Sequence, residues 1–149
     1  MKRLLLYVHF NKYNRVSSHV YYQLIQMRPL FSRVVFITNS HLSQENQDKL
    51  RSQKLMDDFL QRENIGFDFA AWRDGMNHIG FDNLDSYDIV TVMNDTCFGP
   101  LWDVKEHYLS YEKQDEIDFW GLTNNRATKQ FKEHIQSYFI TFKKAVILF

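Results

Sequence analysis

Short runs of apolar residues alternate along the chain with segments of helical periodicity. Nearly continuous apolar runs cover residues 3–10, 33–40 and 87–94. Runs of this length are typical of strands that are buried on both faces of a sheet. Because segments of helical spacing separate these runs, the pattern predicts an α/β fold with a mostly parallel sheet flanked by helices.

The helical segments have recognisable ends. Apolar spacing predicts helices over 17–30 and 67–80. Residues 43–53 are polar with few apolar anchors and are expected to form a solvated helix, and residues 101–114 are also expected to be helical. Ser17 or Ser18 is the expected N-cap of the helix over 17–30 and Pro29 its end, while Ser43 caps the helix over 43–53 and Gly80 ends that over 67–80. The remaining segments are 55–64, which fits a strand or a helix, 117–123, which fits a short strand, and 134–147, which fits a helix, a strand or both.

Each of the three buried runs ends in polar side chains. These are His9 and Asn11 after the first run, Thr38, Asn39 and Ser40 after the second, and Asn94, Asp95 and Thr96 after the third. Parallel strands bring their carboxyl ends to one edge of the sheet, where open α/β sheets bind ligands. We therefore expect Phe10, Ser40 and Asn94 to lie near the same edge and their neighbours to form a ligand site, although polar loops are also ordinary at strand ends.

Composition limits the class of protein and of partner. The 149 residues suit one domain, and their apolar ending KKAVILF leads us to expect that they are part of a longer protein. Eighteen basic and eighteen acidic residues balance, which gives no electrostatic case for a nucleic-acid partner. Cys97 is the only cysteine, which excludes an internal disulfide and fits the reducing cytoplasm. We see neither a signal-peptide pattern nor an apolar run of about 18 residues.

Asp95 is the acid best placed to meet a metal ion. A carboxylate at the carboxyl end of a strand can hold Mg²⁺ or Mn²⁺, which prefer oxygen ligands and often share them with substrate phosphates. Asn94 or Thr96 can orient this carboxylate. The alternative is that Asn-Asp only starts a turn, with Asp95 bonded to nearby backbone amides.

A second candidate region is ENIGFDFAAWRDG, residues 63–75. Gly66 can adopt an unusual backbone angle or let a ligand approach the backbone. Asp68 lies near the start of the next predicted helix, where an acid is favoured by the helix dipole and can cap amides. Capping and ligand binding therefore compete as explanations of Asp68.

Two further residues are candidates for chemistry. Asp118 precedes an apolar and aromatic patch and can act as a general base, or it is a surface acid at the start of a strand. His134 can bind a metal or a phosphate, or it caps and packs. The chain has no G-x-G-x-x-G, Walker, G-x-S-x-G or H-E-x-x-H motif, so the usual dinucleotide and NTPase sites are excluded.

Four segments taken in order resemble the rhamnan synthesis protein F family, bacterial proteins that assemble cell-wall rhamnose polysaccharides. The segments are NIGFDFAAWRDG, YDIVTVMNDTCFGPL, DFWGLT and HIQSYF. The resemblance covers most of the chain. It implies a GT-A-like, Rossmann-like domain that binds a nucleotide sugar, and glycosyltransferase activity in polysaccharide synthesis with dTDP-rhamnose as donor.

The resemblance also implies roles for particular residues. The N-x-G segment is similar to one that lies against the nucleotide in family 2 glycosyltransferases, which puts Gly66 and Asp68 beside the base or ribose. Asp95 lies where GT-A enzymes have an Asp-x-Asp motif that holds a metal on the diphosphate, but its neighbours here are neutral. The nucleotide sugar would also contact His9, Asn11, Thr38, Asn39, Asn94, Thr96 and His134. Asp118 would take the acceptor's proton in an inverting reaction.

The expected partners follow from the same resemblance. The acceptor would be a lipid-linked saccharide or a polysaccharide, and the parent protein would associate peripherally with the inner face of the membrane. The alternative is a non-catalytic GT-A-like module that binds nucleotide or polymer, or that scaffolds other synthases. A flavodoxin-like domain is a third possibility, but the chain lacks a recognisable phosphate loop.

Overall fold

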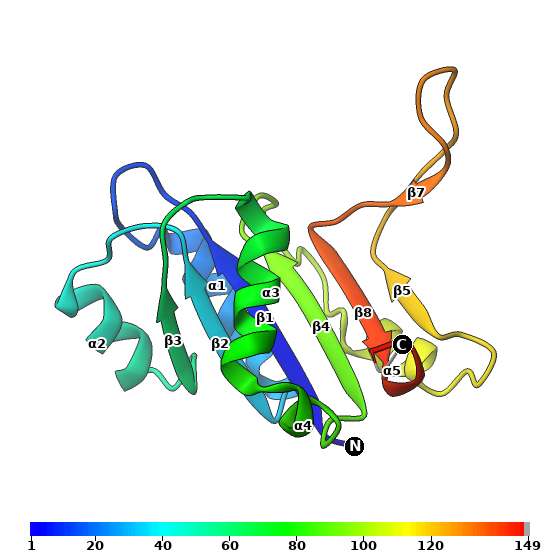
Figure 1. Cartoon of the computed structure of the whole chain (residues 1–149), viewed down its shortest axis with the longest axis horizontal. Helices are drawn as coiled ribbons and strands as arrows, with labels where there is room; N and C mark the ends of the chain where they lie inside the picture. Colours follow the sequence, from blue (N-terminus) through cyan, green and yellow to red (C-terminus); the bar gives the residue numbers. More distant parts are fainter. Residues whose placement is uncertain (148–149) are drawn as a thin grey trace.

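A computed structural model describes residues 1–147 of the chain. Its centre is a six-stranded sheet in the order β3-β2-β1-β4-β8-β5, and a separate two-stranded sheet pairs β6 with β7 (Figure 1). The strands are β1 (Arg3–His9), β2 (Arg33–Thr38), β3 (Asp58–Gln61), β4 (Ile89–Asn94), β5 (Phe119–Gly121), β6 (Asn124–Asn125), β7 (His134–Ile135) and β8 (Phe139–Lys143). The helices are α1 (Ser18–Met27), the 3₁₀ turn η1 (Arg28–Leu30), α2 (Gln44–Ser52), α3 (Phe67–Ile79), α4 (Phe81–Leu84), α5 (Lys105–Glu112) and α6 (Lys144–Ile147).

The parallel part of the sheet is formed by the three apolar runs. β1 pairs in parallel with β2 on one side and with β4 on the other, so that Val8 lies between Ile37 and Asn94 in the register. Every residue of β4 is buried, as is every residue of β1 and β2 after the first. The α/β architecture and the mostly parallel sheet are therefore confirmed. The first and third runs are parallel, as expected, and they are neighbours in the sheet.

The other side of the sheet is antiparallel. β8 runs against β4, and β5 runs against β8. The sequence left residues 134–147 open between helix and strand, and they form β7, β8 and the short α6. Residues 55–64, also left open, contain β3, which pairs in parallel with β2.

Most predicted helix ends agree with the structure. Ser17 is the N-cap of α1, and the Ser43 side chain accepts a hydrogen bond from the Asn46 amide at the start of α2. Gly80 ends α3 as expected, with a positive φ of 84°. The prediction for 101–114 was too long: α5 begins only at Lys105, after a loop that contains Gly99 and Pro100. In the described part of the chain, no helix is long and apolar enough to cross a membrane.

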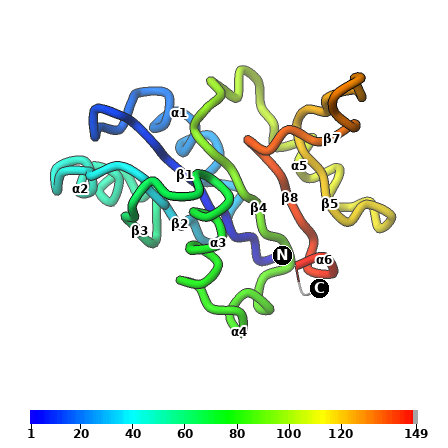
Figure 2. Tube along the Cα trace, turned by 45° about the horizontal axis from the view of Figure 1, so that its top comes forward, coloured from blue at the N-terminus to red at the C-terminus, as the bar shows by residue number. Residues whose placement is uncertain are grey.

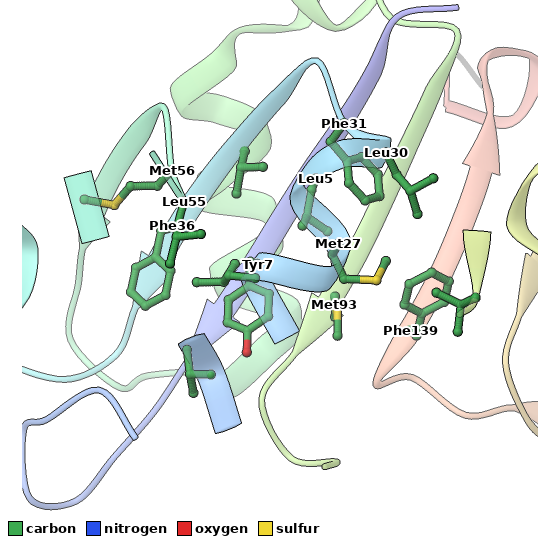
Figure 3. Packing of buried hydrophobic residues seen from close by; sticks show 14 of the residues in the cluster. Leu5, Tyr7, Met27, Leu30, Phe31, Phe36, Leu55, Met56, Met93 and Phe139 are labelled. Carbon is green, nitrogen blue, oxygen red and sulfur yellow. The ribbon is translucent and has the colours of Figure 1, made fainter. Parts of the chain in front are cut away.

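Alternating side chains of the central strands build one core on each face of the sheet. Leu5 and Tyr7 of β1 pack with α1 and α5, whereas Leu4, Leu6 and Val8 pack with α3 and α4. Figure 3 shows the first of these cores, in which Met27 of α1 lies near Tyr7 and Met93 of the sheet, with Phe139 of β8 beside them. Figure 2 shows that the chain leaves β1 and β4 at the same end of the sheet. The polar residues that end these two parallel strands therefore lie at one edge of the sheet.

α3 packs tightly against the sheet at Gly75. A Cβ at this position would lie 2.5 Å from Cδ1 of Ile37 and 3.4 Å from Cδ2 of Leu6. We expect Gly75→Val to lower the free energy of unfolding by about 1–3 kcal/mol, because a branched side chain overpacks this contact. Urea denaturation measures the change. Asn77→Val, on an exposed turn of the same helix, is the matched control, and equal effects of the two substitutions would contradict this account of the packing.

Candidate functional site

Hydrogen bonds connect the residues at the carboxyl ends of β1, β2 and β4. The amide of Phe10 donates to Oδ2 of Asp95 over 3.2 Å. The amide of Asn39 donates to the His9 carbonyl over 2.9 Å, and that of Asn11 donates to Oγ of Ser40 over 2.7 Å. The polar residues that follow the three strands therefore lie together.

Asp95 is a largely buried acid at the centre of this edge. Its side chain is only 12% exposed. Burial raises the pKa of Asp95 to about 6, and the hydrogen bond from the Phe10 amide only partly offsets this effect. The nearby carboxylate of Asp68 raises the pKa of Asp95 further. At neutral pH the carboxylate is mostly ionised and poorly compensated, so it favours a positively charged or hydrogen-donating ligand.

His9 faces Asp95 from β1. It is fully buried, and its Nδ1 lies 2.9 Å from Oγ1 of Thr38. Its Nε2 lies 4.0 Å from Oδ2 of Asp95 and has no hydrogen-bond partner among the described residues. Burial lowers the pKa of His9 to about 4. Because His9 gains its proton only below the pKa of Asp95, the two side chains do not form an ion pair at neutral pH.

Asp68 connects the start of α3 to the exit of β4. Nδ2 of Asn94 donates to Oδ2 of Asp68 over 2.7 Å, while Oδ1 of Asn94 accepts from the amide and the hydroxyl of Thr96. The N-cap of α3 is Gly66, in a left-handed conformation with a φ of 72°. The structure therefore favours a role for Asp68 at the strand exit over the role of a helix cap.

Beyond these residues lies an open, polar hollow of about 660 Å³. Its lining residues share amide, hydroxyl or carboxylate groups, and they include Asp68, Asn94, Thr96, Thr123, Asn124, Asn125, Gln136 and Ser137. Many neutral donors and acceptors with a single carboxylate suit a ligand that carries many hydroxyl groups. The β6–β7 hairpin supplies one wall, and we call this space the polar hollow.

Two predicted site residues lie elsewhere. The carbonyl of Asp118 accepts from the amide of Lys143 at the end of β8, and Lys143 is opposite Ile89, the first residue of β4. Asp118 is thus at the edge of the sheet opposite Asp95. His134 is on the β6–β7 hairpin, where it is exposed and its Nδ1 donates to the Lys132 carbonyl over 2.8 Å.

Several residues of this edge were missed from the sequence. Arg62 donates to Oδ1 of Asn39 and to Oδ2 of Asp74, each over 2.7 Å, and so fixes the loop after β2. His19 donates from Nε2 to the Asp95 carbonyl over 3.1 Å. Asn124 and Gln136 line the polar hollow because the β6–β7 hairpin places them there. Neither periodicity nor a motif marks these positions, because tertiary contacts alone bring them to the site.

The residues present restrict how a metal ion can bind. Within residues 1–147, no group of three or more His, Cys, Asp or Glu side chains is placed to hold a metal. Asp95 and Asp68 are the carboxylates at this edge, with Asn94 between them. Mg²⁺ is commonly held by one or two carboxylates together with substrate phosphates. The donor set therefore fits a cation that arrives with a phosphorylated ligand, and it does not fit a site made of protein ligands alone.

Comparison with known proteins shows the family of the chain. The family model of rhamnan synthesis protein F matches residues 34–148, and the chain belongs to this family. The family's name links the chain to the synthesis of a rhamnose polysaccharide.

Relatives and a solved structure extend the comparison. Virulence protein VirA of Vibrio anguillarum is 31% identical over 90 residues, which are 60% of this chain and 27% of VirA. The uncharacterized protein y4gN of Sinorhizobium fredii is 26% identical over 127 residues, 83% of this chain and 32% of that protein. The chain thus spans about a third or less of these relatives. HddC from Yersinia pseudotuberculosis has a similar fold, with a TM-score of 0.55 at 15% identity over 99% of this chain and 79% of HddC.

The buried pair His9 and Asp95 predicts two opposite effects of pH on stability. The pKa of Asp95 is about 6 in the folded chain and 3.8 when unperturbed, so Asp95 favours folding at low pH and this contribution is lost as pH rises from about 4 to 6. The pKa of His9 is about 4 in the folded chain and 6.5 when unperturbed, so His9 favours folding at high pH and this contribution is lost as pH falls from about 6.5 to 4. The two contributions nearly cancel in the wild type.

Single substitutions should reveal each contribution. Relative to wild type, Asp95→Asn should gain stability as pH rises from 4 to 6.5, and His9→Asn should lose stability over the same range, each by up to about 3 kcal/mol. Urea denaturation at a series of pH values measures both slopes. Slopes of the same sign in the two variants would contradict the burial of this pair.

Proposed function

We propose that the chain is the nucleotide-sugar-binding part of a glycosyltransferase that transfers rhamnose from dTDP-rhamnose during polysaccharide synthesis. The fold would then be a GT-A-like variant of the α/β sandwich. The observation that carries the proposal is the joint placement of Asp95, Asn94 and Asp68 at the carboxyl edge of the parallel strands, beside the polar hollow. Ligands of open α/β sheets bind at this edge.

The polar hollow supports a sugar ligand. Its amide and hydroxyl side chains match the hydroxyl groups of a pyranose, and Asp68 provides a stronger, charged acceptor among them. The residues that end or follow β1 and β2 (His9, Asn11, Thr38 and Asn39) would place the nucleotide on the adjacent side of Asp95. His134 remains a candidate only because it lies on the β6–β7 hairpin, which forms one wall of the polar hollow.

The reaction requires stabilisation of a departing nucleoside diphosphate. A divalent cation held by Asp95 and the diphosphate would neutralise the leaving group when bound. Lys12 and Arg15 lie on the loop after β1, each over the ring of Tyr13, and add positive charge to the same edge. We do not assign Asp118 as the base, because it lies at the opposite edge of the sheet.

A binding module without catalysis is the second candidate. Asn94 and Thr96 are neutral where GT-A enzymes carry a second acid, and Asp118 is remote from Asp95. This candidate predicts binding of dTDP-rhamnose with no release of dTDP in the presence of acceptor. The parent protein, cytoplasmic and at the inner face of the membrane in this proposal, would then supply the missing catalytic group.

The proposal predicts that donor affinity depends on Asp68. Asp68→Asn should weaken the binding of dTDP-rhamnose by at least about tenfold, because a hydrogen bond to a charged group contributes about 1.5–3 kcal/mol. Calorimetric titration in the presence of Mg²⁺ measures the affinity. Asp48→Asn on the exposed face of α2, where Asp48 is 64% exposed, is the matched control. The same affinity in wild type and Asp68→Asn would exclude Asp68 from the donor site.

A further inference from the structure

The two faces of the sheet are covered unequally. On one face α1, η1 and α5 lie against the sheet, and α5 packs Tyr108 against Trp120 of β5 and Phe139 of β8. On the other face α3 packs on β1 and β2, and Figure 1 shows that none of the described helices lies in front of the middle of β8. In the described part of the chain, β8 and β5 are therefore covered on one face only.

The uncovered face of these two strands carries apolar side chains. Phe139 belongs to the covered core, whereas Ile140 and Phe142 are half-buried and pack against the core on the other face. Phe119 of β5 stacks on Phe142, with 6.3 Å between the ring centroids, and is 51% exposed. An antiparallel strand that faces water usually has polar side chains on that side. β8 instead has large apolar side chains on both sides, which is the pattern of a strand that is covered on both faces.

A groove of about 240 Å³ lies between α3 and β8 on this face. Ile140 and Phe142 line it from β8. Trp72 and Met76 line it from α3, and Phe81, which is 70% exposed, lines it from α4. Of the described residues that line the groove, only two are polar. Contiguous apolar surface of this kind marks a site of contact with another element or partner. We call this space the α3–β8 groove.

The dimensions of the uncovered area suit one helix. Packed helices lie about 8–10 Å apart and neighbouring strands about 4.7–4.9 Å apart, so one helix covers about two strands. A helix packed beside α3, which lies over β1 and β2, would therefore lie over β4 and β8. β8 has five residues, which is a length of about 17 Å and matches about three turns of helix. Such a helix would need an apolar stripe on the side that meets Ile140 and Phe142.

The parent protein is the source of this helix that the observations favour. The chain spans about a third or less of the relatives that it matches, so those proteins contain further chain that can cover the face. β8 is followed directly by α6, and Ile147 of α6 packs against the same core as Ile140 and Phe142. The polypeptide after β8 thus already lies on the uncovered face.

We propose that an amphipathic helix from the remainder of the parent protein, outside residues 1–149, packs in the α3–β8 groove and completes the layer of helices on this face of the sheet. The apolar side of the helix would cover Ile140, Phe142 and Phe119, and its polar side would face water. The inference does not depend on the proposed function, because no residue of the α3–β8 groove is assigned to the nucleotide or to the sugar.

Hydroxyl-radical footprinting read by mass spectrometry tests the proposal on the wild-type sequence, so no variant has to fold. The experiment compares the 149-residue chain with the parent protein. In the 149-residue chain Phe69, Phe81 and Phe119 should be oxidised readily, because each is at least half exposed. In the parent protein the three should lose most of this reactivity, because the helix excludes water from them. Phe131, which is 66% exposed on the β6–β7 hairpin, is the matched control and should keep its reactivity.

A substitution tests the same contact through stability. Phe119→Lys should lower the melting temperature of the parent protein more than that of the 149-residue chain, because only the parent protein buries the introduced charge. Phe131→Lys is the control and should change both melting temperatures equally little.

Several results would overturn the proposal. Equal reactivity of Phe81 and Phe119 in the chain and in the parent protein would do so, as would an equal loss of reactivity at Phe131. Protection that appears in the 149-residue chain alone as its concentration rises, with a dimer in sedimentation, would assign the face to a second copy. Protection of the chain that requires phosphatidylglycerol vesicles would assign it to a lipid surface. Either assignment would also overturn the proposal, and neither would alter the expected binding of dTDP-rhamnose.

Discussion

The arrangement of this protein depends on the burial of three neighbouring parallel strands. Because β1, β2 and β4 are covered on both faces, their side chains are mostly apolar, and polar side chains are concentrated at the strand ends. Thr91 in the middle of β4 is an exception, and its hydroxyl is hydrogen-bonded to Tyr108 and Thr141. Parallel pairing then brings those ends to one edge. The helices that cover the two faces also position this edge: α3 brings Asp68 to Asn94, and α1 brings His19 to the loop after β4.

The same burial gives the edge its chemistry. Burial shifts the pKa values of His9 and Asp95 in opposite directions. It lowers the pKa of His9 and raises that of Asp95, so each side chain favours its neutral form. An acid held in this way costs stability at neutral pH unless something binds it. Such a cost is typical of residues kept for a ligand, and proteins concentrate perturbed groups at functional sites. The polar hollow lies on the side of Asp95 toward β8 and the β6–β7 hairpin, whereas the ends of β1 and β2 lie on its other side.

The sequence was a good guide to whatever depends on local pattern. The three apolar runs predicted the parallel strands, and their polar exits predicted that His9, Thr38 and Asp95 would meet. Asp118 and His134 were chosen from their neighbours along the chain. Asp118 precedes β5, which runs in the same direction as β4, so Asp118 lies at the edge of the sheet where β4 begins. His134 lies exposed on the β6–β7 hairpin. Asn124, Gln136 and Arg62 were missed because only long-range contacts give them a role. Residues 101–104, the last part of the β4–α5 loop, were predicted to begin the next helix, although the helix starts only at Lys105 and Leu101 and Trp102 are exposed.

The central claim is that the edge around Asp95 binds a nucleotide sugar, and amide chemical-shift mapping by NMR during a titration with dTDP-rhamnose tests it most directly. The backbone amides of Phe10 and Thr96 donate to Asp95 and Asn94, so bound ligand should shift both, together with Asn39 and Asp68. The amides of Asp88, Asp118 and Lys143 at the opposite edge should stay unchanged and serve as internal controls. Shifts confined to the opposite edge, or no saturable shift at Phe10 and Thr96, would contradict the account.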